Sequence, residues 1–151
     1  MIRAILLLAA LPMAAHAESW RAASYGEDYP GVVVLIDADS VVRADGKVTF
    51  RAQSLFEVAL TSNITRAIEK MEADCSAMTY QISNSLFYSG TQFVEEDVRA
   101  SKTFTAVEGS TNWGMLLTAC GRRDYQSPVV VDPMGFADDY FYELAMTGDG
   151  F

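Results

Sequence analysis

The sequence predicts an α+β fold: an antiparallel sheet of about five to six strands packed against a disulfide-tethered helix, with a second helix in a C-terminal tail. Three observations support this prediction. Short alternating or β-branched segments are separated by turn residues, one segment from Ser110 to Gly121 has marked helix ends, and the chain contains two cysteines, Cys75 and Cys120.

The first half of the chain contains clear strand signals. Residues 32–36 form an unbroken run of Val, Leu and Ile, which is typical of a central strand covered on both faces. Asp45-Gly46 predicts a two-residue hairpin turn, after which residues 47–55 alternate between apolar and polar side chains. We expect the apolar set to face the core and the polar set to face water: Val48, Phe50 and Ala52 inward, and Lys47, Thr49, Arg51 and Gln53 outward.

The tetrapeptide Asp37-Ala38-Asp39-Ser40 is a candidate metal motif, because calcium-binding loops begin with acidic residues at this spacing. The mid-loop glycine and the terminal glutamate of such a loop are absent at the required offsets. We therefore predict no metal site, but a bend in which Asp and Ser side chains bond to backbone N–H groups.

Residues 66–74 fit two structures. Good helix formers and charges at helical spacing favour a helix, whereas alternation also permits a strand, since sheet context often overrides local propensity. Ser89-Gly90 predicts a turn into a strand at 92–94, and residues 102–108 predict a short extended piece. The segment before that turn alternates like a half-buried strand, with these residues on its apolar side: Met78, Tyr80, Ile82, Leu86 and Tyr88.

Residues 110–121 carry the best-marked helix signals. Ser110 is a favourable N-cap, and Gly121 stands where a helix-terminating glycine is expected. The spacing of the apolar stripe predicts that Cys120 points toward the sheet that carries Cys75, so that a bridge would hold the helix to the sheet. The stripe consists of Trp113, Leu116, Leu117 and Cys120.

The N-terminal residues predict export. A positive start, an apolar run at 5–11 and the small-x-small site Ala15-His16-Ala17 identify residues 1–17 as a signal peptide. No cysteine stands at the cleavage point, so we expect no lipoprotein. The apolar run is also shorter than the about 20 residues that a membrane anchor needs, so we expect cleavage and no membrane span in the mature chain. In an oxidising compartment, the two cysteines favour one structural disulfide over a redox pair, which usually has CxxC spacing.

Charge and histidine content argue against several classes of function. The formal net charge is −9, which disfavours nucleic acids and anionic membranes as partners. The single histidine, His16, lies in the predicted signal peptide. The mature chain would therefore lack a Ser-His-Asp or Cys-His site and the commonest zinc ligand. We expect no enzyme, no cofactor and no metal.

Residues 122–151 are interpreted as a tail. Its valine run at 129–131 is extended, and Phe136, Ala137, Tyr140, Phe141, Leu144 and Ala145 recur at helical spacing. Such a helix either covers its own domain or binds a partner, and we favour the first.

Three stretches carry a family resemblance: "VVVLIDADSVVRADGKVTFRAQS", "EADCSAMTYQISNSLFYSGTQF" and "VEGSTNWGMLLTACG". They resemble the surface-adhesin protein E family of Gram-negative bacteria. The resemblance implies an antiparallel sheet packed on a helix, bridged cysteines, a strand at 66–74 and adhesion to host matrix proteins such as vitronectin and laminin. The matching positions are Asp37, Ser40, Gly46, Asp74, Cys75, Tyr88, Ser110 and Cys120.

We predict an exported, non-enzymatic binding module at residues 18–121, similar to surface adhesin E, with a host matrix or envelope protein as its partner. The alternative is a periplasmic structural or assembly partner that docks through its C-terminal helix. A third class, an enzyme without histidine, would need a serine beside a lysine or two inward carboxylates. The candidate partner-binding residues are aromatic: Trp20, Tyr25, Tyr29, Phe136, Tyr140 and Phe141.

Overall fold

The computed structural model describes residues 18–28 and 30–147. The predicted signal peptide, residues 1–17, lies outside the described residues, as do Tyr29 and residues 148–151.

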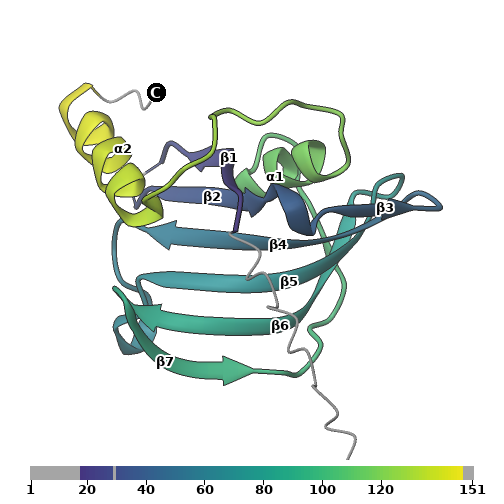
Figure 1. The fold of residues 1–151 in the computed structure, drawn as a ribbon, viewed down its shortest axis with the longest axis horizontal. Helices are drawn as coiled ribbons and strands as arrows, with labels where there is room; N and C mark the ends of the chain where they lie inside the picture. Colours follow the sequence, from purple (N-terminus) through teal and green to yellow (C-terminus); the bar gives the residue numbers. More distant parts are fainter. Residues whose placement is uncertain (1–17, 29, 148–151) are drawn as a thin grey trace, which may run out of the picture.

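Eight strands in the described part of the chain form one antiparallel sheet (Figure 1). Six follow the spatial order β1-β2-β4-β5-β6-β7, while β3 pairs with β4 and β8 pairs with β6. The strands are β1 Trp20–Gly26, β2 Val32–Asp37, β3 Val42–Ala44, β4 Lys47–Phe56, β5 Arg66–Asp74, β6 Thr79–Ser89, β7 Gln92–Asp97 and β8 Phe104–Thr105. Two short 3-10 turns, η1 Ala38–Ser40 and η2 Thr61–Asn63, and two helices, α1 Thr111–Ala119 and α2 Pro133–Thr147, complete the fold. The α+β class is confirmed, with more strands than we expected.

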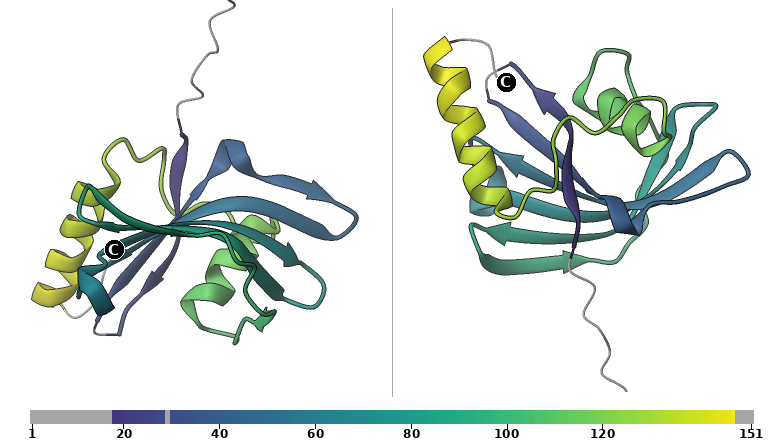
Figure 2. Two further views of the ribbon diagram at one scale, coloured as in Figure 1. Left: turned by 90° about the horizontal axis from the view of Figure 1, so that it is seen from below. Right: turned by 45° about the horizontal axis from the view of Figure 1, so that its top comes forward.

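The two helices pack against opposite faces of the sheet (Figures 1 and 2). On the α1 face, Val34 and Ile36 of β2 join a core cluster with Leu116. On the α2 face, Val33 and Leu35 join a second cluster with residues of α2. Residues 32–36 are therefore buried on both sides, as their unbroken apolar run predicted.

Strand β4 shows where alternation alone misleads. Val48, Phe50 and Ala52 are buried as predicted, but Gln53, which was expected to face water, is only 1% exposed. Gln53 lies between Leu35 of β2 and Ile68 of β5, on the face that also carries the α2 cluster. Because both faces of this part of the sheet are covered, the polar side chain is buried and the prediction is wrong.

Residues 66–74 form a strand, β5, so the helix favoured by local propensity is overruled by the sheet. Its pairing with β6 is interrupted by a bulge: Lys70 pairs with Asn84 and Met71 with Ile82, which leaves Ser83 as an extra residue. A bulge reverses the face on which later side chains lie. Leu86 and Tyr88 consequently do not share the face of Tyr80 and Ile82, and that part of the prediction is wrong.

The acidic tetrapeptide forms the predicted bend, with η1 at its centre. Ser40 Oγ donates to the carbonyl of Asp37 at 2.7 Å and accepts from the Arg51 N–H at 2.8 Å. Asp37 Oδ1 accepts from the Ser19 N–H at 3.0 Å. These side chains are used in closing the bend, and the described residues contain no group of three or more His, Cys, Asp or Glu side chains able to hold a metal ion.

The tail lies on its own domain. Between the helices it runs along the outer edge of β1 (Figure 2), where the N–H groups of Gln126 and Val130 donate to the carbonyls of Ala22 and Trp20 at 2.8 and 2.7 Å. The Ala22 N–H donates to Ser127 Oγ at 2.8 Å. Helix α2 then buries one side against the sheet, through Ala137, Tyr140 and Leu144.

Candidate binding groove

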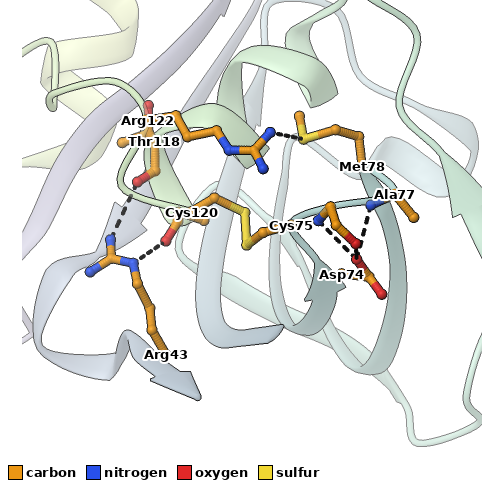
Figure 3. The surroundings of a disulfide bond; sticks show 10 residues. Arg43, Asp74, Cys75, Ala77, Met78, Thr118, Cys120 and Arg122 are labelled. Atoms are coloured by element: carbon orange, nitrogen blue, oxygen red, sulfur yellow. Dashed lines mark hydrogen bonds between the residues drawn. A yellow bond between two sulfur atoms is a disulfide. The ribbon is translucent and has the colours of Figure 1, made fainter. Parts of the chain in front are cut away.

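The disulfide fixes α1 on the sheet. Cys75 directly follows β5 and Cys120 caps the C-terminus of α1, with their Cα atoms 5.7 Å apart (Figure 3). Beside it, Arg43 Nε donates to the carbonyl of Ala119 at 2.7 Å. The predicted bridge is confirmed, and it holds the last turn of the helix against the end of a central strand.

Both predicted ends of α1 are confirmed. Ser110 Oγ accepts from the Trp113 N–H at 3.2 Å. At the other end, Gly121 has a φ of 72°, and the Arg122 N–H donates to the carbonyl of Leu117 at 2.8 Å, which is the closure typical of a glycine-terminated helix.

The buried side of α1 is rotated from the predicted stripe. It contains Gly114, Met115, Leu116, Thr118 and Ala119, whereas Trp113 and Leu117 are half-buried. The helix approaches β1 so closely at Gly114 that an added Cβ would clash with Ser24 Oγ. This contact leaves Trp113 at the border between the core and the surface.

A groove with a volume of about 610 Å³ opens beside Trp113. It lies between the β1–β2 connection, the N-terminus of α1 and the first residues of the tail. Its lining includes Tyr25, Glu27, Asp28, Thr111, Trp113 and Arg123.

The wall formed by the tail is held in place by hydrogen bonds. The Arg123 guanidinium donates to the carbonyl of Ala23, and its Nε donates to Thr118 Oγ1 at 3.4 Å. Thr118 Oγ1 also donates to the carbonyl of Ala23 at 3.2 Å. Strand β1, helix α1 and the tail are thus joined at one point beneath the groove.

Tyr25 borders the groove at the end of β1, and its ring packs on the tail helix at the α2 side of the sheet. Its ring stacks on Tyr140 with centroids 4.8 Å apart, and Phe136 lies 6.5 Å away. Burial, together with the neighbouring Tyr140, raises the pKa of Tyr25 to about 12. The phenol is therefore neutral over the physiological range and is able to donate or accept a hydrogen bond.

The groove lining carries charges of both signs. Glu27 and Asp28 are exposed on the β1–β2 side, while Arg123 stands on the tail side. The lining includes hydroxyl groups of Ser24, Ser110 and Thr111, but among its residues there is no lysine or histidine to activate them. This combination of aromatic surface, charges of both signs and hydroxyls suits the binding of a polar chain segment.

The predicted aromatic residues lie mainly in or around the second core cluster. Tyr25 borders the groove, but its ring packs with Phe136 and Phe141 around that cluster. Trp20 and Tyr140 are only 4% and 1% exposed, so they contribute to packing and not to an exposed patch. Tyr29 lies outside the described residues.

Several groove residues were missed by sequence reasoning. Trp113 was interpreted as part of the buried helix stripe, although its place one turn after the N-cap puts it near the helix end. Glu27, Asp28 and Arg123 carry no functional prediction from the sequence. The position of the two acidic residues directly after an aromatic strand end is the one available signal.

Comparison with known proteins identifies the family. The family model described as surface-adhesin protein E matches residues 20–121. The chain belongs to the surface-adhesin protein E family. The resemblance seen in the motifs is thereby confirmed, and this adhesin E family member carries a tail beyond the matched region.

A solved structure has the same fold. Crystal form II of Haemophilus influenzae protein E matches with a TM-score of 0.51 and 11% sequence identity, covering 70% of this chain and 90% of that one. At this identity the likeness concerns the fold alone. The comparison with curated protein sequences found no match. Neither helix in the described part of this adhesin E family member has the length and apolar composition needed to cross a membrane.

Proposed function

We propose that this protein is an exported, non-enzymatic binding module of the surface-adhesin E type, and that its partner is a host matrix or envelope protein. Export is supported by the predicted signal peptide and by a disulfide, which persists in oxidising compartments. Adhesion is supported by membership of a surface-adhesin family.

The observation that carries the proposal is the groove beside Trp113. It combines aromatic surface from Trp113 with charges of both signs, on a support fixed by the disulfide and by the Arg123 hydrogen bonds. Aromatic residues and arginine are the residue types that most often dominate protein–protein binding energy. We infer that a polar segment of the partner lies in this groove.

The test is binding of the purified chain from Glu18 onward to immobilised vitronectin and laminin, measured by surface plasmon resonance. Reversing the rim charges with Glu27→Lys and Asp28→Lys should weaken binding about tenfold, since complementary charge at an interface rim guides association. Glu108→Lys is the matched control, because Glu108 is exposed in a loop outside the groove lining. Equal binding by all three proteins would contradict the groove as the site.

A second candidate function is docking to an envelope protein through α2. The outer side of this helix exposes Tyr142 and Met146, by 65% and 68%, at positions one turn apart. Under this alternative, Tyr142→Ser with Met146→Ser would abolish capture of a periplasmic partner while matrix-protein binding stayed unchanged. The Glu27→Lys and Asp28→Lys variant would behave in the opposite way.

A further inference from the structure

The two edges of the sheet differ. The edge at β1 is covered by the tail through the hydrogen bonds to Trp20 and Ala22. At the other edge, β7 pairs with β6 and with no other strand of the described chain, and a bulge at Val94 interrupts this pairing. An uncovered edge strand presents backbone N–H and C=O groups that are able to pair with another extended chain.

Strand β7 also exposes apolar side chains. Phe93 and Val94 are 54% and 42% exposed, and Val98, just beyond the strand, is 69% exposed. Phe93 contacts Tyr88 of β6 edge-on, with centroids 5.8 Å apart, which holds its ring beside the edge. Proteins usually keep large apolar side chains off an open edge, because such an edge attracts further strands.

The other half of β7 is acidic on both faces of the sheet. Glu95 pairs with Phe87 and Glu96 with Leu86, so their side chains lie on opposite faces. Glu96 accepts from Asn84 Nδ2 at 2.7 Å, and Asp97 is paired with Arg99 at 2.8 Å. A strand added here would therefore meet carboxylates above and below the sheet.

We propose that the free edge of β7 binds one extended segment of a partner protein, in which a pair of adjacent basic residues follows or precedes apolar residues. The basic pair would lie opposite Glu95 and Glu96, one side chain on each face, and apolar residues beyond the bulge at Val94 would cover Phe93. This inference rests on the proposed function as a protein-binding module, but it assigns a surface separate from the groove.

Charge complementarity selects this occupant over a second copy of the chain. Pairing two β7 strands would gather the carboxylates of both copies along one short edge, and like charges in neighbouring strands are destabilising. The formal net charge of −9 also opposes the association of two copies. A basic segment instead gains opposite-charge pairs across the new ladder.

The experiment uses the chain from Glu18 onward and a fluorescent peptide of about ten residues, long enough for one strand. The peptide contains Val and Thr around a central Lys-Lys pair. One control peptide carries Glu-Glu in place of the lysines. Another carries backbone N-methyl groups on consecutive residues, which keep the charge but block both hydrogen-bonding edges of the strand. Fluorescence anisotropy should show the Lys-Lys peptide binding at least about tenfold more tightly than either control.

Variants of the protein locate the site. Glu95→Lys with Glu96→Lys should weaken peptide binding about tenfold, whereas Glu108→Lys should leave it unchanged. Equal affinity for the N-methylated peptide would overturn the proposal, as it would show charge attraction without strand addition. A homodimer that protects β7 amides from hydrogen exchange would also overturn it, with a second copy as the occupant.

The peptide experiment tests the β7 edge independently of the groove. Glu27→Lys with Asp28→Lys should not change peptide binding if β7 is the site. Loss of matrix-protein binding in that variant, together with no peptide binding to any form of the protein, would support the groove and refute the edge.

Discussion

Removing the disulfide with Cys75→Ala and Cys120→Ala should destabilise the protein by about 4 kcal/mol. The bridge closes a loop with a sequence separation of 45. The chain-entropy model assigns about 4 kcal/mol to a loop of that length, because the cross-link restricts the unfolded chain. In the folded state, α1 retains other attachments, including the Arg43 and Thr118 hydrogen bonds, so the native fold should persist in the variant.

Urea unfolding followed by tryptophan fluorescence measures this loss. With a slope of about 2 kcal/mol per M, the unfolding midpoint of the variant should fall by about 2 M. Reduction of the unmodified protein should produce the same midpoint as the double substitution. Native-state hydrogen exchange supplies a second readout, since it reports separately on α1 and on the sheet.

A loss below about 1 kcal/mol would refute this reasoning, since it would mean that the unfolded chain is already compact between the two cysteines. Faster exchange confined to α1, at unchanged global stability, would also refute it. That result would show that the bridge only prevents local detachment of the helix.

Three further predictions concern the packing of α2, the N-cap of α1 and the pH dependence of stability. Tyr140→Ala should lower the free energy of unfolding by about 3 to 5 kcal/mol, measured by thermal unfolding. Tyr142→Ala, on the exposed side of the same helix, should change it by no more than about 0.5 kcal/mol. Equal effects would show that α2 is not packed on the sheet. Ser110→Ala should cost about 1 kcal/mol and Ser110→Gly only a few tenths, and the reverse order would contradict the observed N-cap. Burial raises the pKa of the Glu69 carboxyl above 4.5, an effect partly offset by a hydrogen bond from Ser85. A protein whose carboxyl has a higher pKa in the folded state than in the unfolded state becomes less stable as pH rises. Glu69→Gln should therefore match the unmodified protein below pH 4.5 and exceed its urea midpoint increasingly above it, whereas a constant difference would argue against a raised pKa.

Local signals in the sequence predicted local structure well. The Asp45-Gly46 turn, the bend after Asp37, the ends of α1 and the pairing of the cysteines each depend on a few adjacent residues or on compartment chemistry. The strand β5 was predicted only through the family resemblance, because its composition of Arg, Glu, Lys, Met and Ala is equally compatible with a helix.

Features that depend on distant parts of the chain were missed. The extra residue at Ser83 belongs to the pairing between β5 and β6, and no local pattern marks it. Gln53 is buried because α2 and its neighbours cover a face that alternation assigned to water. The groove also depends on distant parts of the chain. Its residues Tyr25, Trp113 and Arg123 come from three elements that meet only in the folded protein.

The contact between the tail and β1 joins residues about one hundred positions apart, as in the hydrogen bond from Ala22 to Ser127. A chain that emerges N-terminus first therefore carries β1 with an open edge until residues 126–130 have been delivered. Contacts of such long range form slowly, because the loop must close before they contribute. During that interval the apolar side chains beneath α2 are uncovered. Pairing of residues 126–130 with β1 should thus be a late step in the folding of this protein.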